Sequence, residues 1–77
     1  MGVRWRAATA ADSFREGEGV IVAEQARGIV VADADAGSET VPVEIRQAKG
    51  FANTWDYSHV GDVYDVPIAS LSVLRDD

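Results

Sequence analysis

Short apolar runs and alternating apolar and polar residues follow one another along most of this chain. From residue 19 onward the dominant period is two, which is typical of β-strands, and helical periodicity is missing. The alternation is clearest over residues 40–46, where Val41, Val43 and Ile45 share one parity. The pattern therefore predicts an all-β chain in which these three residues point inward.

Breaks in this pattern divide the chain into short elements. Strands are predicted at residues 19–24, 27–33, 40–46, 51–60, 63–67 and 72–75. Residues 34–38 predict a tight turn, and the pair Gly61-Asp62 predicts a type II′ turn with glycine first. Residues 68–71 suit a single 3-10 turn. Pro42 has no N–H for a ladder, so an exposed strand edge is expected there.

The number and shortness of these strands favour one small barrel. Five or six short antiparallel strands, with one 3-10 turn near the C-terminus, are the content of a small SH3-like barrel, which also removes free strand edges. We expect residues 14–77 to form this single domain and residues 1–13 to be an N-terminal arm or lead-in. An open half of a β-sandwich, completed by a second chain, is the alternative.

Composition narrows the classes of function. With 77 residues and no cysteine, the chain suits one domain without disulfides, so oligomerisation or docking onto a larger partner is a fair expectation. Residues 31–77 carry nine acidic and three basic residues, which supplies the whole net charge of −6 and disfavours general nucleic-acid binding. No run approaches the ~18 apolar residues of a membrane span. No signal-like apolar segment follows the N-terminus, so a cytoplasmic location is expected.

The order of apolar and turn positions from residue 14 onward resembles the SH3-like barrel pattern. Within it, residues 61–71 are similar, without gaps, to a segment of the plasmid-borne type II dihydrofolate reductases, Gly-x-Val-Gln-Ile-Tyr-Pro-Val-Ala-x-Leu. Residues 14–20 also fit the first strand of that family. The resemblance implies an SH3-like barrel of which four copies surround one shared active-site pore.

The differences from that family fall where its ligands bind. The family's Gln-Ile-Tyr is replaced by Tyr64-Asp65-Val66, and its basic first-strand residue maps onto Ile21. An apolar residue and an additional carboxylate do not suit an anionic dinucleotide. The resemblance therefore favours the fold and argues against the activity.

A looser resemblance links residues 28–43 to the small capsid-decorating proteins of tailed phages. The shared unit is a glycine and an apolar strand, then a turn of alanine, aspartate and glycine, then a strand with alternating valines. It implies a structural protein of a phage or similar mobile element, which would be located in the virion.

A partial calcium-loop spacing is present in the acidic turn. Asp33, Asp35, Gly37 and Glu44 match part of it, but the glycine at position six and the flanking helices are missing. No cluster of histidine and cysteine suits zinc, and no glycine-rich loop opens a helix. We therefore predict no metal and no cofactor.

His59 is the only histidine. Its neighbour Ser58 would point to the opposite face of a strand, and Ser70 follows a later strand. Nothing in this spacing resembles a nucleophile elbow. We expect His59 to lie at a hairpin rim, and we predict no catalytic residue.

Aromatic residues beside carboxylates are the best candidate for a functional surface. Trp55, Tyr57 and Tyr64 would form an anchor patch if exposed together, although Phe51 or Trp55 is expected to be buried. The bordering carboxylates are Asp56, Asp62 and Asp65. Such a patch suits a protein partner bearing arginine or lysine. Trp5, between Arg4 and Arg6, would extend this surface as an arm across a neighbouring subunit, or cover the barrel mouth.

The sequence thus predicts a non-catalytic protein-interaction or assembly module, which binds a protein partner or further copies of itself. Two alternatives stay open. One is a pore-type oligomeric enzyme related to the type II dihydrofolate reductases. The other is an acidic inhibitor or nucleic-acid mimic that binds a basic protein.

Overall fold

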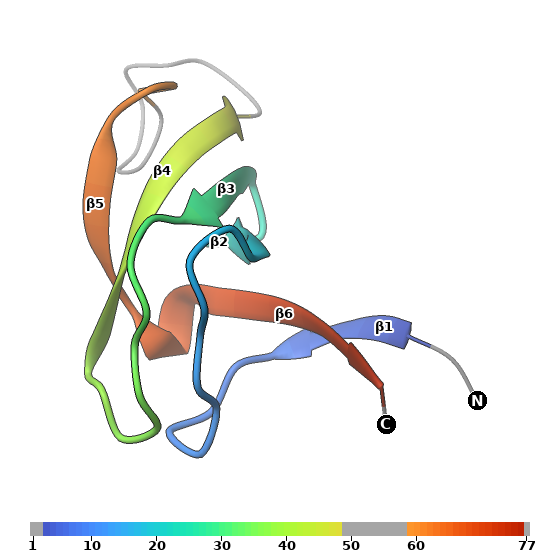
Figure 1. Cartoon of the computed structure of the whole chain (residues 1–77). Coiled ribbons are helices and arrows are strands. Elements are labelled where there is room, and N and C mark those ends of the chain that lie inside the picture. The colour runs from blue at the N-terminus through green and yellow to red at the C-terminus, as the bar shows by residue number, and fades with distance from the viewer. Residues whose placement is uncertain (1–2, 49–58, 77) are drawn as a thin grey trace.

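The fold is an antiparallel sheet of six strands, seen in a computed structural model that describes residues 3–48 and 59–76 (Figure 1). The strands are β1 (Val3–Ala7), β2 (Gly19–Val22), β3 (Ala26–Val30), β4 (Thr40–Ala48), β5 (Val63–Pro67) and β6 (Leu71–Asp76), and a 3-10 turn covers Ile68–Ser70. Their order in the sheet is β1-β6-β2-β3-β4-β5. The predicted all-β class, the short antiparallel strands and the single late 3-10 turn are confirmed.

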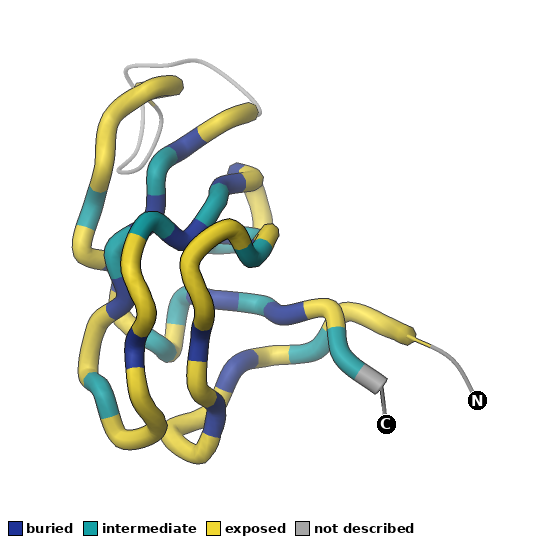
Figure 2. The backbone as a smooth tube through the Cα atoms, in the orientation of Figure 1, coloured by how far each residue is buried: buried dark blue, intermediate teal, exposed yellow. Residues whose placement is uncertain are grey.

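The core lies on the inner face of the strongly curved sheet (Figure 2). Alternate residues of β2 to β6 point into it, since side chains along a strand alternate between the two faces. The largest fully buried side chains are Phe14, Val20, Val22, Val30, Val41, Val43, Ile45, Val66, Leu71 and Val73. The inward orientation predicted for the three apolar residues of segment 40–46 is therefore confirmed.

The sequence analysis expected an exposed strand edge at Pro42; β4 as a whole is an inner strand, because it lies between β3 and β5. The ladder between β3 and β4 ends at the pair Val30 and Val43. Pro42 lies just beyond it and accepts a hydrogen bond from the N–H of Val31 (3.0 Å) through its carbonyl. Proline has no N–H to donate back to β3, which is consistent with the end of the ladder at this point.

Gly28 lies where β3 and β4 approach closely. The register shifts between Arg27 and Gly28, so that Arg46 is an extra residue on β4. A Cβ atom at Gly28 would meet the side chain of Val43 and would lie 2.7 Å from the carbonyl oxygen of Glu44. Only glycine fits this approach, and the bulge adds curvature to the sheet.

The turn before β5 differs by one position from the prediction. The N–H of Asp62 donates to the carbonyl of His59 (3.2 Å), so Val60 and Gly61 are the central residues. Gly61 has φ +95°, and glycine is therefore second, which is the φ pattern of a type II turn rather than type II′. The N–H of Gly61 also bonds the carbonyl of Ile45 (2.7 Å), which extends the pairing with β4. The predicted turn at residues 34–38 is present, with Gly37 at φ +91°.

An unexpected tight turn ends β2 at Val22, two residues before the predicted end, whereas β3 begins at Ala26 and ends at Val30, three residues before its predicted end. Ala23 and Glu24 have φ values of 51° and 60°, and the N–H of Gln25 donates to the carbonyl of Val22 (3.1 Å). Two consecutive left-handed residues are the φ pattern of a type I′ turn, which usually contains asparagine or glycine. We call residues 22–25 the β2–β3 turn.

The N-terminal arm contains a strand that the sequence analysis did not predict. β1 pairs with β6 from Val3 opposite Asp76 to Ala7 opposite Ser72. β6 pairs with β2 only over Leu71–Val73, so its last residues pair with β1 alone. Figure 1 shows this two-stranded segment projecting from the rest of the fold, and we call it the β1–β6 ribbon. The strand predicted at residues 51–60 falls, up to residue 58, outside the described residues.

Candidate functional site

The predicted aromatic and acidic patch is only partly within the described residues. Trp55, Asp56 and Tyr57 lie outside them, as does Phe51. Tyr64 and Asp65 are consecutive on β5 and point to opposite faces: Tyr64 packs against the core, and Asp65 is exposed on the outer face.

Trp5 lies far from this patch in the strand order. It is on β1, and Tyr64 is on β5, at the other end of the sheet. Asp62 is exposed in the turn before β5. The structure therefore does not bring Trp5 together with the aromatic residue of β5, and the two must be considered as separate surfaces.

A small polar group surrounds His59. Its Nδ1 lies 3.3 Å from the hydroxyl of Tyr64 and 3.8 Å from a carboxylate oxygen of Asp62. His59 precedes β5, whereas Ser70 follows it, so a five-residue strand of about 17 Å separates them. The topology therefore excludes a catalytic triad that contains both His59 and Ser70.

The three residues that align with the reductase ligand positions do not face one way. Val66 is fully buried in the core, Tyr64 is half-buried against it, and Asp65 is exposed. Ile21, which aligns with the basic first-strand residue, is half-buried on the outer face. These positions share no common open surface within one chain.

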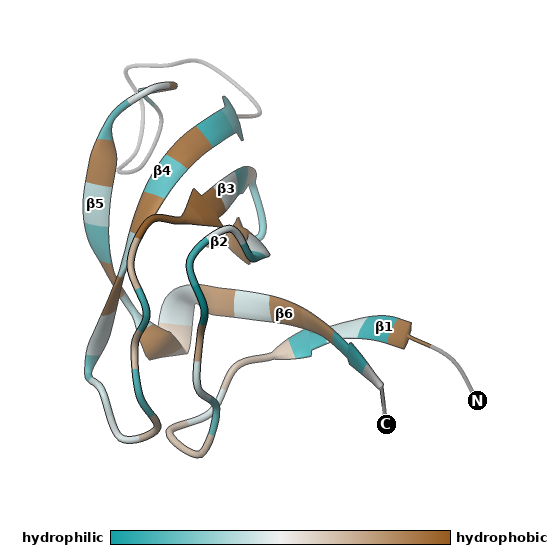
Figure 3. Ribbon diagram, in the orientation of Figure 1, coloured by the Kyte–Doolittle hydropathy of each residue, from teal (hydrophilic) through white to brown (hydrophobic). Residues whose placement is uncertain are grey.

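The outer face of the β1–β6 ribbon carries exposed apolar side chains. Trp5 is directly opposite Leu74, and Val3 precedes Trp5 by two residues, so all three share this face. Their exposed fractions are 57% for Val3, 39% for Trp5 and 44% for Leu74. In Figure 3 the start of β1 is strongly hydrophobic, and hydrophilic positions alternate with paler ones along the rest of the strand. We call these three residues the ribbon face.

The inner face of the ribbon is held by charge. Asp12 is the one charged residue classed as buried in the described part of the chain, with 8% exposure. Both of its carboxylate oxygens accept hydrogen bonds from Arg6, at 2.7 and 3.0 Å, and the N–H of Thr9 adds a third at 2.8 Å. This geometry fixes β1 to the loop that precedes β2.

Arg75 extends the same network from β6. One of its Nη atoms lies 3.8 Å from Asp12, and the other donates to Glu18 and to the carbonyl of Ser13, both at 2.8 Å. Its guanidinium also lies 5.8 Å from the ring centroid of Phe14, which is a cation–π distance. We call Arg6, Asp12, Glu18 and Arg75 the ion network.

The ion network sets the protonation of Asp12. The hydrogen bonds from Arg6 hold the pKa of the Asp12 carboxyl well below its ordinary value, and the Thr9 N–H and the charges of Arg6 and Arg75 act in the same direction. Burial opposes this effect but is smaller. Asp12 is therefore ionised at neutral pH, and the ribbon is pinned by a full negative charge.

Sequence reasoning missed this network, although a signal for its strand was present. Residues 3–7 alternate with period two, which puts Arg4 and Arg6 on one face and Val3 and Trp5 on the other. Since Arg6 points inward to Asp12, the neighbouring Trp5 points outward. The same alternation thus creates both the ion network and the ribbon face.

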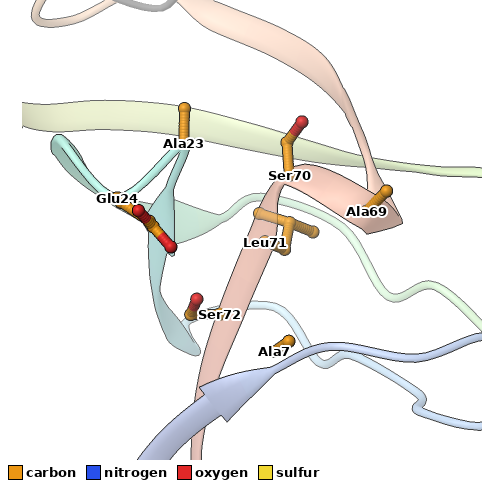
Figure 4. Close-up of a pocket in the computed structure, with 7 residues that line it drawn as sticks. All are labelled: Ala7, Ala23, Glu24, Ala69, Ser70, Leu71 and Ser72. Carbon is orange, nitrogen blue, oxygen red and sulfur yellow. The ribbon is translucent and has the colours of Figure 1, made fainter.

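A hollow of about 250 Å³ opens between the ribbon and the β2–β3 turn (Figure 4). Its lining is small and partly polar: Ala7, Ala23, Glu24, Ala69, Ser70, Leu71 and Ser72. Among the described residues, none forms a hydrogen bond or ion pair with the carboxylate of Glu24 or the hydroxyls of Ser70 and Ser72. These groups are available to a ligand. Among the residues 3–48 and 59–76, no cluster of three metal-ligating side chains occurs.

No protein family, curated protein or solved structure matches this chain. The resemblances to SH3-like barrels, type II dihydrofolate reductases and phage decorating proteins therefore stay predictions. Within the part of the chain that the structure describes, no helix has the length and apolar content needed to cross a membrane.

Proposed function

We propose that this protein is a non-catalytic protein-interaction or assembly module, which binds a partner protein through the ribbon face. One observation carries the proposal: Val3, Trp5 and Leu74 are exposed side by side on a projecting ribbon. Clustered exposed apolar side chains are typical of contact surfaces. Tryptophan is also among the residue types most enriched at the energetic centres of interfaces.

The backbone of β1 offers a second means of attachment. β1 is at one end of the strand order, so one of its edges is unpaired by any described strand. An extended segment of a partner can add to such an edge through main-chain hydrogen bonds, while its side chains contact the adjacent face. The ribbon face would then supply the specificity.

The charge of the chain defines the partner further. A net charge of −6 attracts a basic protein and repels nucleic acid. A structural protein of a phage or similar mobile element is the setting we propose, supported by the small size and the resemblance of residues 28–43 to decorating proteins.

The test uses a ribosome-displayed library of random peptides selected on the immobilised protein. The selected peptides are then synthesised, and their affinities are measured by fluorescence polarisation against wild type and Trp5→Ala. We expect Trp5→Ala to weaken binding by about tenfold or more, because it removes the central anchor.

Val63→Ala is the matched control for this test. Val63 is also an exposed apolar residue, at 54%, but it lies on β5 at the other end of the sheet. Peptides that bind Trp5→Ala as tightly as wild type would overturn the proposal. A solution tetramer that binds a nicotinamide nucleotide in calorimetry would replace it with the pore-enzyme alternative.

A further inference from the structure

We propose that the hollow beside the β2–β3 turn binds a basic side chain, lysine or arginine, of the partner segment that the ribbon face anchors. This inference rests on the proposed function and adds the chemistry of the partner to it. Three independent features of the described residues support it: the lining of the hollow, the backbone that positions Glu24, and the continuity with Trp5.

The lining suits a cationic group on a slender stem. Glu24 supplies the single charge, while Ser70 and Ser72 add hydroxyl acceptors and the alanines add apolar walls. The carboxylate and both hydroxyls have no partner among the described residues, so they remain free to accept hydrogen bonds. An ammonium or guanidinium group provides only donors, which matches this set of acceptors.

The backbone holds Glu24 in an unfavourable conformation at the rim of the hollow. Ala23 and Glu24 both have positive φ, which side chains with a Cβ atom rarely adopt. The N–H of Ala23 donates to the carbonyl of Ser70 (2.7 Å), which ties the turn to the 3-10 turn across the hollow. Asparagine and glycine would form this turn more easily. Residues in sparsely populated backbone conformations cluster at functional sites, which supports a role for Glu24 in binding.

The hollow continues the ribbon face. Ala7 and Ser72 line the hollow, and each lies two residues from a ribbon-face residue, Trp5 or Leu74 respectively. Same-face residues two apart on a strand are separated by about 7 Å. One partner segment can therefore reach both sites. In an extended segment, a large apolar residue and a basic residue would occur two positions apart.

Arg27 places a positive charge near the hollow, and its effect on a bound cation is opposite to that of Glu24. In the strand register, Ser72 pairs with Ile21 and Ile21 with Arg27, so Arg27 lies two strands away on the same outer face. Two strand spacings are about 10 Å, within the reach of a partly screened charge. Arg27 would therefore weaken the binding of a cation in the hollow slightly.

The test uses the peptides selected from the random library. We expect them to contain lysine or arginine two positions from a large apolar residue. Replacement of that arginine by neutral citrulline, or Glu24→Gln in the protein, is expected to weaken binding about tenfold. Arg27→Gln is expected to strengthen binding about twofold. Glu24 is exposed, so Glu24→Gln leaves the fold intact.

The outcomes separate this inference from the proposed function. Peptides that depend on Trp5 but bind Glu24→Gln as tightly as wild type would overturn the basic-side-chain inference and leave the ribbon face standing. Peptides that are indifferent to Trp5→Ala would overturn the proposed function. A direct titration with N-butylguanidinium, followed by the NMR amide shifts of Glu24 and Ser72, tests the hollow alone. Equal shifts in wild type and Glu24→Gln would also overturn the inference that the hollow binds a basic side chain.

Discussion

The body of the sheet and the β1–β6 ribbon are held by different forces. In the body, formed by β2 to β5 and the start of β6, alternate valines are buried and pack against Phe14 and Ile45. In the ribbon, the inward side chains beyond the core are arginines that pair with Asp12 and Glu18, while the large apolar side chains face solvent. The body uses its apolar residues for stability. The ribbon leaves them free for contact, and relies on charge for its own attachment.

Among the substitutions considered, Gly28→Ala in the body is expected to reduce stability the most. The added Cβ would meet the side chain of Val43 and the carbonyl oxygen of Glu44, and the backbone of Glu44 cannot move away without disturbing the β3–β4 ladder. We expect a loss of about 3 kcal/mol in the free energy of unfolding, measured by urea denaturation with circular dichroism. Gly19→Ala is the control, since a Cβ there meets open space. A loss of less than about 1 kcal/mol for Gly28→Ala would contradict the close approach.

The second largest loss of stability is expected for Asp12→Ala, which affects the attachment of the ribbon. This change leaves Arg6 and Arg75 without their shared carboxylate. Because their side chains are 34% and 30% exposed, both can turn to water, so we expect a loss of about 2 kcal/mol rather than the ~3–5 kcal/mol of a fully buried pair.

Hydrogen exchange distinguishes a local from a global effect of Asp12→Ala. We expect the amides of β1 to exchange faster, while those of β3 and β4 keep most of their protection. Asp62→Ala, at an exposed carboxylate, is the control and should change stability by no more than about 0.5 kcal/mol. Equal loss of protection in β1 and β4 would show that the ribbon and body unfold together.

Low pH should destabilise the ribbon before the body, without any mutation. The folded-state pKa of Asp12 is lowered, so its contribution is complete above the unfolded value of about 4 and is lost as the pH falls towards the lowered folded value. We therefore expect β1 amides to lose protection between about pH 5 and pH 2. In Asp12→Asn this part of the pH dependence should be missing. An unchanged acid profile in that variant would show that other carboxyls dominate.

The smallest expected effect is at the β2–β3 turn, where a substitution should increase the stability of the fold. Ala23→Gly relieves an unfavourable φ of 51°, so we expect a gain of about 0.5–1 kcal/mol in the free energy of unfolding. Thermal denaturation of the variant measures it. Ala26→Gly is the matched control, because Ala26 is buried in β3 and lies outside the left-handed region, and it should lose stability. A loss for both variants would show that Ala23 is not strained.

The body was largely predictable from sequence, and the ribbon was not. The period-two pattern at Val41, Val43 and Ile45 located β4 and its inward face, because burial of one face fixes the alternation. β1 was missed because its alternation combines arginines with Trp5, and arginines do not look like an inward face unless Asp12 is already known to be there. Proximity of residues far apart in sequence, such as Asp12 and Arg75, is set by the folded topology.

Local turn chemistry explains the remaining differences. Ala23 and Glu24 are not turn-forming residues, so β2, the strand before them, was predicted too long. Gly61 signalled a turn correctly, but the pairing with Ile45 moved it by one position. The hollow was not predictable at all, since its lining comes from β1, the β2–β3 turn, the 3-10 turn and β6.

The pairing of Val3 with Asp76 has a practical consequence for engineering this fold. The two residues are directly opposite in the β1–β6 ladder, so their Cα atoms are about 5 Å apart, and Figure 1 shows the start of β1 and the end of β6 near each other at the ribbon tip. A short linker between them would convert the ribbon into an ordinary hairpin. New ends opened in the exposed turn at residues 35–38 would then give a circular permutant that keeps every strand pair of the sheet.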